Sequence, residues 1–191
     1  MTERQAEIIE KSMDLIAEKG IQGLTIKNLS KKIGISEPAI YRHYSSKNEI
    51  VLALLSIFDE MSIMFSSMMQ TFEGTAVEKI QFMFDKMIGM FIDNPSMVAV
   101  IFSEELFKNE DVLNNRVKKI QNRNQETVEN ILIQGKENHD IRDDIDTKYL
   151  AILVMGALRF LVNKWNLNDK NFNLKKEGTG LLTSIKILLK K

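Results

Sequence analysis

Apolar residues recur at spacings of three and four along most of this 191-residue chain, which is the period of an amphipathic α-helix. Near the amino terminus Ala6, Ile9, Met13 and Ile16 follow this spacing, and Gly20 comes after them as a helix-ending residue. No strand-like alternation stands out, and only two prolines and nine glycines interrupt the pattern. The pattern predicts an all-α fold of about nine helices.

The later helices are predicted from the same spacing and from turn residues. Pro95 suits the first turn of a helix, and a single apolar stripe from Leu113 to Ile131 predicts one long helix. The predicted ranges are Lys27–Ile33, a short helix after Ser36, Lys47 to about Gly74, Thr75–Asp93, Pro95 to about Phe107, Asp111–Asn138, Asp146–Trp165 and Leu174–Lys190.

The stretch GLTIKNLSKKIGISEPAIYRHYSSKNE, residues 23–49, predicts two short helices with a glycine turn between them. Thr25 can cap the first helix, and Gly34 follows it where a left-handed residue ends a helix at little cost. Ser36 can cap the second helix, and Pro38 falls in its first turn. Two short helices joined by such a turn form a helix-turn-helix, whose second helix enters the major groove of DNA.

The two predicted helices have distinct inner and outer faces. The residues expected to pack inward are Leu29, Ile33, Ile40 and Tyr44. The residues expected at or near the surface are Glu37, Ala39, Tyr41, Arg42 and His43.

Charge is distributed unevenly along a chain whose formal net charge is zero. Residues 22–47 carry five basic residues and one acidic residue, a net charge of +4, whereas residues 51–150 carry 10 basic and 17 acidic residues, a net charge of −7. A basic unit attached to an acidic body is typical of a protein that contacts phosphate at one end only. Residues 151–191 carry a net charge of +6, from either a solvated helix face or a second DNA contact.

The run LTIKNLSKKIGISEPAIYRHYSSKNEIV resembles the DNA-binding domain of TetR-type bacterial transcriptional regulators. The pattern that carries the resemblance is formed by Tyr41, His43, Tyr44, Lys47, Glu49 and Ile50. The resemblance is strong over residues 5–55 and looser over the rest, where IRDDIDTKYLAILVMGALRFL is similar to the eighth helix of these regulators and its lead-in. It implies a three-helix DNA-binding domain at residues 1–46 and a larger helical-bundle domain for effector binding and dimerisation at residues 47–191.

The resemblance also implies which side chains face DNA. These are Lys27, Glu37, Pro38, Ala39, Tyr41, Arg42, His43 and Lys47. Arg42 suits a base contact, because a guanidinium can bridge guanine O6 and N7. Tyr41, His43 and Lys47 are better suited to the phosphate backbone. Glu37 either accepts a hydrogen bond from cytosine N4 or only offsets the helix dipole.

Other classes of site find little support in the sequence. The absence of cysteine excludes disulfides and thiolate metal sites, and no catalytic constellation, cofactor motif or metal motif is found. The acidic residues from Asp140 to Asp146 lack the glycine and glutamate of a calcium loop, so a solvated loop with Asp146 as a helix cap is expected. The charged amino terminus and a longest uncharged run of twelve residues, Met61–Phe72, predict a cytoplasmic protein that is not an enzyme and has no membrane partner.

The predicted body is rich in methionine and phenylalanine, which suits either a plain packed core or a soft pocket for lipophilic molecules. The TetR resemblance implies an effector cavity, and we expect a lipophilic effector, such as a long-chain acyl compound or an amphiphilic drug-like molecule. The candidate pocket residues are Met61, Phe65, Met83, Met87, Phe91, Phe102 and Met155.

The last two predicted helices carry more apolar residues than a surface helix of a monomer needs. The run YLAILVMGALRFLV forms one apolar helix, and Leu181, Leu182, Ile185, Leu188 and Leu189 form a second stripe. We expect both to contribute to a homodimer. The predicted function is a ligand-responsive transcriptional regulator, a repressor by analogy with most of the family, that binds a pseudo-palindromic operator. The alternative is a DNA-binding regulator controlled by a protein partner; a helical-bundle enzyme and a lipid carrier fit less well.

Overall fold

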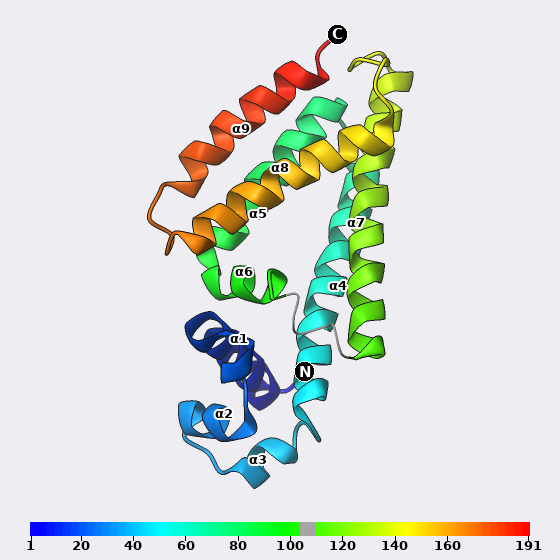
Figure 1. Cartoon of the computed structure of the whole chain (residues 1–191). Helices are drawn as coiled ribbons and strands as arrows, with labels where there is room; N and C mark the ends of the chain where they lie inside the picture. Colours follow the sequence, from blue (N-terminus) through cyan, green and yellow to red (C-terminus); the bar gives the residue numbers. More distant parts are fainter. Residues whose placement is uncertain (104–109) are drawn as a thin grey trace. The chain divides into compact units, whose positions relative to one another are not determined.

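The computed structural model describes residues 1–103 and 110–191, and these residues form an all-helical fold without strands (Figure 1). The helices are α1 (Glu3–Gly23), α2 (Ile26–Ile33), α3 (Glu37–Tyr41), α4 (Lys47–Thr71), α5 (Ala76–Asp93), α6 (Pro95–Ile101), α7 (Asp111–Glu137), α8 (Thr147–Leu167) and α9 (Leu174–Leu189). The all-α prediction is confirmed, and most predicted bounds lie within two residues of those observed.

Two predicted helix ends show how local chemistry terminates a helix. Gly20 has φ 66°, a left-handed conformation that interrupts α1 three residues before its end, as its predicted role as a terminator requires. Helix α6 was predicted to continue to about Phe107, which is wrong because the helix ends at Ile101. The Ser103 N–H turns back to the Val100 carbonyl at 3.1 Å, and Phe107 lies outside the described residues.

The chain divides into two compact units. Unit 1 comprises Met1–Met61 and Asn94–Lys119, and unit 2 comprises Ser62–Asp93 and Ile120–Lys191. Helices α4 and α7 therefore each contribute residues to both units. The functional boundary predicted between residues 46 and 47 remains a prediction, and the compact unit that contains the helix-turn-helix extends beyond it.

Unit 1 has a continuous apolar core that joins the helix-turn-helix to its neighbours. Ile8 of α1, Leu29 of α2, Ile40 of α3 and Ile50 of α4 are all fully buried in it. Val100 of α6 joins the same cluster. Each such side chain stabilises the fold by about 1.5–3 kcal/mol through removal of apolar surface from water. The short helices α2 and α3 therefore take their stability from this shared core, since helices of this length are marginal alone.

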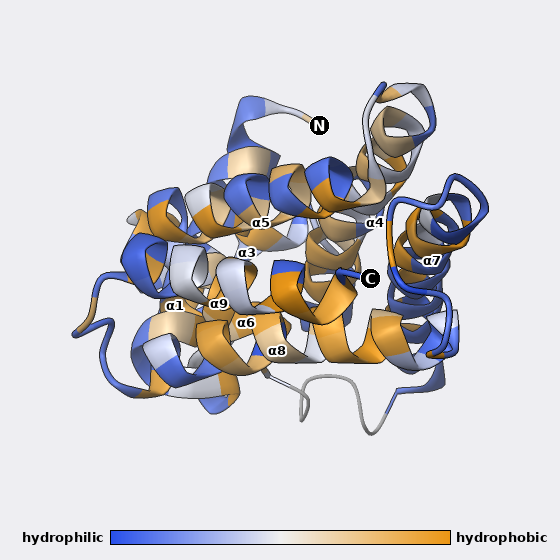
Figure 2. Cartoon of the chain, turned by 90° about the horizontal axis from the view of Figure 1, so that it is seen from above, coloured by the Kyte–Doolittle hydropathy of each residue, from blue (hydrophilic) through white to orange (hydrophobic). Residues whose placement is uncertain are grey.

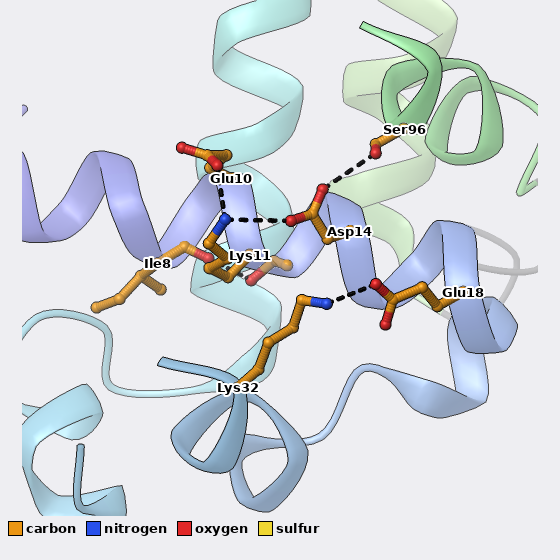
Figure 3. A network of polar contacts seen from close by, with 8 residues as sticks. Ile8, Glu10, Lys11, Asp14, Glu18, Lys32 and Ser96 are labelled. Carbon is orange, nitrogen blue, oxygen red and sulfur yellow. Dashed lines mark hydrogen bonds and ion pairs between the residues drawn. The ribbon is translucent and has the colours of Figure 1, made fainter. Parts of the chain in front are cut away.

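Polar contacts at the surface of unit 1 link α1 to α2 and α6 (Figure 3). The Ser96 hydroxyl donates to the Asp14 carboxylate at 3.1 Å, and Lys32 donates to Glu18 at 2.6 Å. Lys11 lies between Glu10 and Asp14, and the hydrogen bonds to Glu10 and then to Asp14 raise the pKa of its ammonium group. These pairs are exposed or half-exposed, so water and salt screen them and they add little to the stability of the fold.

In unit 2, α9 packs against α5 and α8. A Cβ added at Gly178 of α9 would lie 2.1 Å from the Cδ1 of Ile88 in α5, which shows how close the two helices are. Leu182, Ile185 and Leu189 of α9 are buried within this single chain. Leu181 and Leu188 of the same predicted stripe are half-buried, and Ile187 is exposed. Part of the α9 stripe therefore serves the core of its own chain, and its contribution to a dimer stays a prediction.

Helices α4 and α8 are long and apolar enough, by length and composition alone, to cross a membrane. This is weak evidence, because core helices of soluble proteins meet the same criterion. Charged side chains interrupt both helices, and Asp59 of α4 is buried beside Arg116 of α7, whose Nη2 lies 3.0 Å from its Oδ2. An ion pair of this kind suits a protein core better than a lipid-facing helix.

Candidate DNA interface

Helix α2 begins and ends with the predicted residues. The Thr25 hydroxyl accepts the Asn28 N–H at 3.1 Å, which satisfies one of the free donors at the helix start. Gly34 ends the helix with φ 81° and ψ 28°, and the N–H groups of Gly34 and Ile35 both donate to the Ser30 carbonyl. The Thr25 cap and the glycine turn are confirmed.

The predicted side-chain cap at Ser36 is wrong. Ser36 has the extended backbone of a capping residue, but its hydroxyl makes no capping hydrogen bond. A cap accepts from the second or third helical residue, and the second residue here is Pro38, which has no N–H. The third, Ala39, donates instead to the Ser36 backbone carbonyl at 2.9 Å. Pro38 therefore leaves Ala39 as the remaining donor for a cap, and the backbone carbonyl of Ser36 accepts its N–H in place of the hydroxyl.

The inward and outward faces of the helix-turn-helix follow the predicted division. Leu29, Ile40 and Tyr44 are buried, and Ile33 packs against them while partly exposed. The exposed candidates are Lys27, Glu37, Pro38, Tyr41 and Arg42, and the half-buried candidates are Ala39, His43 and Lys47. Tyr41 is 50 % exposed, which is high for an aromatic side chain without a partner surface. The fold thus presents an aromatic and a cationic side chain next to each other on α3 and the turn after it.

Tyr44 and Glu49 hold the start of α4. Burial of Tyr44, reinforced by the Glu49 carboxylate, raises the pKa of the phenol, so Tyr44 stays neutral in the core at neutral pH. The Glu49 carboxylate accepts the Ser45 N–H at 2.6 Å, and the Ser46 hydroxyl accepts the Glu49 N–H at 3.2 Å. Tyr44 and Glu49, two residues of the pattern that carries the TetR resemblance, thus have structural roles. The prediction that Tyr44 packs in the core is confirmed.

Lys47 is half-buried at the first position of α4. Its ammonium group donates to the backbone carbonyl of Ile21 at 3.5 Å, and burial lowers its pKa. This contact ties α4 to the end of α1 across 26 residues of sequence. The spacing of apolar residues in the sequence did not predict this contact. The predicted contact with a DNA phosphate stays a prediction.

The seven candidate effector residues are divided between the two units. Met61 and Phe102 belong to unit 1, and Phe65, Met83, Met87, Phe91 and Met155 belong to unit 2. Met83 and Phe91 are buried, and Phe65, Met87 and Met155 are half-buried. Whether they form one pocket stays a prediction.

Two surface depressions are lined by other residues. A depression of about 450 Å³ is lined by Arg142, Asp143, Asp144, Lys190 and Lys191, and one of about 260 Å³ is lined by Leu15, Glu18, Lys19, Asn28, Lys31 and Lys32. In the first, Asp144 accepts two hydrogen bonds from Arg142, and these lower the pKa of its carboxyl. The nearby Asp146 caps α8 by accepting the Lys148 N–H at 2.8 Å, as predicted. The acidic loop is therefore held by protein contacts, and the described residues contain no group of three or more potential metal-binding side chains.

Comparison with known proteins accounts for nearly the whole chain. Residues 8–54 match the family described as "Bacterial regulatory proteins, tetR family", and residues 58–186 match "YsiA-like protein, C-terminal region". A fatty acid metabolism regulator protein of Bacillus subtilis is 23 % identical over 171 residues, covering 88 % of this chain and 86 % of that protein. The nucleoid occlusion factor SlmA of Vibrio campbellii is 21 % identical over 169 residues, covering 88 % and 86 %.

Solved structures show the same fold. The transcriptional regulator FadR from Bacillus subtilis, in complex with stearoyl-CoA, superposes with a TM-score of 0.77 at 21 % identity, covering 94 % of this chain and 96 % of that one. Together the matches indicate a helix-turn-helix transcription regulator with a helical carboxyl-terminal domain.

Proposed function

Because the chain belongs to the tetR family of bacterial regulatory proteins, we propose that it is a cytoplasmic, ligand-responsive transcriptional repressor that binds a pseudo-palindromic operator as a dimer. The observation that carries the proposal is the exposed face of α3 and the turn after it. Arg42 and Tyr41 are exposed there, and the fully buried Ile40 anchors α3 in the apolar core of unit 1. A fixed helix with exposed donors is what base recognition in the major groove needs.

The proposed roles at the DNA follow from side-chain chemistry. Arg42 reads a guanine through a bidentate hydrogen bond, whereas Tyr41, His43 and Lys47 contact phosphates and set the register. Lys27, at the start of α2, adds a phosphate contact, and Pro38 and Ala39 lie close to the base edges. The net charge of +4 over residues 22–47 supplies the long-range attraction.

The exposed apolar face of α8 supports a dimer. Ile152, Leu153 and Phe160 are exposed, Phe160 by 71 %, and Figure 2 shows α8 as a largely hydrophobic helix. A contiguous stripe of this kind marks a protein interface. Gly156 in the same helix has open space where a Cβ would lie, so a second helix can approach closely. Two recognition helices about 34–36 Å apart would then read one operator.

The proposed effector is a long-chain acyl compound. The solved structure of the Bacillus subtilis FadR regulator contains stearoyl-CoA, and a related curated protein is a fatty acid metabolism regulator. These relatives favour small-molecule control over the alternative of control by a protein partner. The unbranched, polarisable side chains of Met83 and Met87 suit a flexible acyl tail.

Helix α4 is the proposed route from effector to DNA, because it supplies residues to both compact units. Lys47 begins this helix and Phe65 lies in its second half. Suppose that the protein has two conformations that differ in the placement of α4. A ligand that binds one conformation more tightly shifts the equilibrium toward it, by no more than the difference between its two binding free energies.

Operator binding and its release test the proposal directly. Full-length protein is titrated into labelled DNA from upstream of its own gene, with and without stearoyl-CoA, and fluorescence anisotropy is recorded. We expect tight, salt-dependent binding that is at least tenfold weaker with stearoyl-CoA. Binding that no acyl compound alters would reject the effector class, and the absence of sequence-specific binding would reject the regulator.

A further inference from the structure

Asp59 is a buried carboxylate in the middle of α4, in a long and otherwise apolar part of that helix. It is 3 % exposed, and Asp59 and Glu60 are the only charged residues between Glu49 and Glu73. Arg116 of α7 supplies a cation, and its Nη2 lies 3.0 Å from the Asp59 Oδ2. Both partners belong to unit 1, which also contains the helix-turn-helix. A charged pair therefore joins α4 to α7 inside the unit that carries the candidate DNA interface.

An ion pair at this position is a poor source of stability. Taking a carboxylate out of water costs free energy, and the attraction to a guanidinium does little more than offset that cost, so a well-packed apolar pair is often at least as stable. Apolar contacts are already present, because Leu54 and Leu55 of α4 and Leu113 of α7 are buried in the same cluster. The role of the pair is therefore to be sought in the arrangement that it specifies.

The pair specifies the register between α4 and α7. Apolar attraction has no direction, so an apolar contact alone tolerates several registers, whereas a buried polar residue selects one. If α4 moved along its axis by one turn, about 5.4 Å, Leu55 or Ile63 would take the place of Asp59 opposite Arg116. The buried carboxylate would then lose this cation, which makes the shifted register unfavourable.

A second buried polar residue of α4 also pairs with α7. In unit 2 the Ser62 hydroxyl donates to the Asn124 Oδ1 at 2.7 Å, and Ser62 is buried. Asp59 and Ser62 are the buried polar side chains of α4, and each has its partner on α7. The two contacts, one within each unit, both require a particular residue of α4 to lie beside a particular residue of α7.

The first half of α4 connects this register to the candidate DNA interface. Lys47 begins the helix twelve residues before Asp59, which is about 18 Å along the axis at a rise of 1.5 Å per residue. A continuous helix carries any shift along its axis to its first residue. The register at Asp59 therefore determines where the Lys47 ammonium lies relative to its partner, the Ile21 carbonyl of α1.

We propose that Asp59 and Arg116 are positioning residues for operator binding, because they hold α4 in the one register along α7 that places Lys47 at a DNA phosphate. This inference rests on the proposed function and on the proposed phosphate contact of Lys47. It extends the machinery of DNA binding beyond the three-helix domain to the beginning of α7, and it requires no effector.

Replacing the pair by apolar residues separates positioning from stability. The full-length double variant Asp59→Leu with Arg116→Met is compared with wild type by thermal melting and by anisotropy titration of labelled DNA from upstream of the gene. We expect it to melt at or above the wild-type temperature, because the desolvated charges are gone. Operator binding should nevertheless be about tenfold weaker, the loss of one charge-assisted contact. A folded double variant that binds the operator like wild type would overturn the inference.

The salt dependence shows whether the pair acts through Lys47. The slope of log affinity against log salt should fall by about 1 in the double variant, as for the loss of one phosphate contact. Adding Lys47→Met to the double variant should weaken binding no further, since the contact is already lost. Independent, additive losses would show that the pair does not position Lys47 and would contradict the inference.

Single variants at Arg116 keep the inference testable if the double variant does not fold. The Arg116 side chain is partly exposed, so both Arg116→Lys and Arg116→Met are compared at a temperature where circular dichroism shows them folded. Arg116→Lys retains the cation and should keep most of the operator affinity, whereas Arg116→Met should lose it. Equal operator affinity in Arg116→Met and wild type would reject the positioning role.

The exposed ion pair between Arg142 and Asp144 in unit 2 provides the matched control. The double variant Arg142→Met with Asp144→Leu removes the same two kinds of residue and should bind the operator like wild type. If the variants of the α4–α7 pair also bind like wild type, the inference fails and the proposed function stands. If wild type itself shows no sequence-specific binding, the proposed function fails, and the inference fails with it.

Discussion

The ammonium group of Lys47 at the start of α4 donates to the carbonyl of Ile21 near the end of α1, at 3.5 Å. This hydrogen bond joins the first helix of the chain to the helix that follows the recognition helix. Burial lowers the pKa of Lys47, which means that the folded protein penalises its charged form. A nearby phosphate would have the opposite effect on this pKa and would favour the charged form.

The pKa of Lys47 therefore predicts a pH dependence of DNA binding. If Lys47 meets a phosphate, its pKa rises on binding and the complex takes up a proton when the free protein has lost it. Affinity should then fall as the pH rises through the lowered pKa of the free protein toward 10.5. Anisotropy titrations across this range measure the effect, and Lys47→Met should remove this component of the pH dependence.

The same variant should also weaken binding to all DNA sequences alike. Loss of one phosphate contact is expected to lower the slope of log affinity against log salt by about 1. An unchanged slope together with an unchanged pH profile would limit Lys47 to its structural contact with Ile21.

Arg42 should determine sequence preference. Arg42→Ala is expected to cost about 1–3 kcal/mol of operator affinity and to relax the preference at one base pair, because a bidentate contact with guanine is lost. Arg42→Lys keeps the charge but not the planar pair of donors, so it should keep non-specific affinity and still lose specificity. Competition titrations with operators changed at single positions separate the two. Equal specificity in wild type and Arg42→Lys would assign Arg42 to the backbone.

Gly135 should be required for the packing of α5 on α7. In Gly135→Ala the new Cβ would meet the Cβ of Ala76 at 2.4 Å, and neither atom can rotate away. We expect a loss of about 1–3 kcal/mol in the free energy of unfolding, because overpacking forces the helices apart. Gly89→Ala in α5 is the control, since nothing lies within 4 Å of its added Cβ.

The control should be neutral or stabilise by about 0.5–1 kcal/mol through helix propensity. Urea denaturation followed by circular dichroism gives both values. A Gly135→Ala variant as stable as wild type would show that α5 and α7 can separate without cost.

The helices and the inward residues of the helix-turn-helix could be predicted because their signals are local. Thr25 and Gly34 act within a few residues of their own positions, and Leu29 and Ile40 repeat with the period of their helices. The cap at Ser36 failed for an equally local reason: Pro38 has no N–H to donate, and the Ala39 N–H donates to the Ser36 backbone carbonyl instead. The spacing of apolar residues therefore predicts the buried face of a helix reliably. It is a poorer guide to the individual hydrogen bonds at the helix ends.

Contacts between residues far apart in the sequence could not be predicted from the spacing of apolar residues. The contacts of Lys47 with Ile21 and of Lys79 with Gln134 join residues 26 and 55 positions apart, and no periodicity links them. Apolar stripes have a different ambiguity. Burial inside one chain and burial between two chains have the same driving force, so Leu182 and Ile185 could not be assigned before the packing of α9 on α5 was known.

The exposed stripe of α8 predicts a dimer that one substitution should break. Phe160 is 71 % exposed, and burying it against a second copy would remove a large apolar surface from water. Phe160→Asp would place a charge at that contact, so we expect a predominantly monomeric protein with at least tenfold weaker operator binding. Val112→Asp is the matched control, because Val112 of α7 is 65 % exposed and lies outside the proposed interface. Analytical ultracentrifugation should give wild type and Val112→Asp a mass near twice 22.0 kDa. A wild-type monomer at micromolar concentration, or a Phe160→Asp dimer, would assign the exposed face of α8 to something other than self-association.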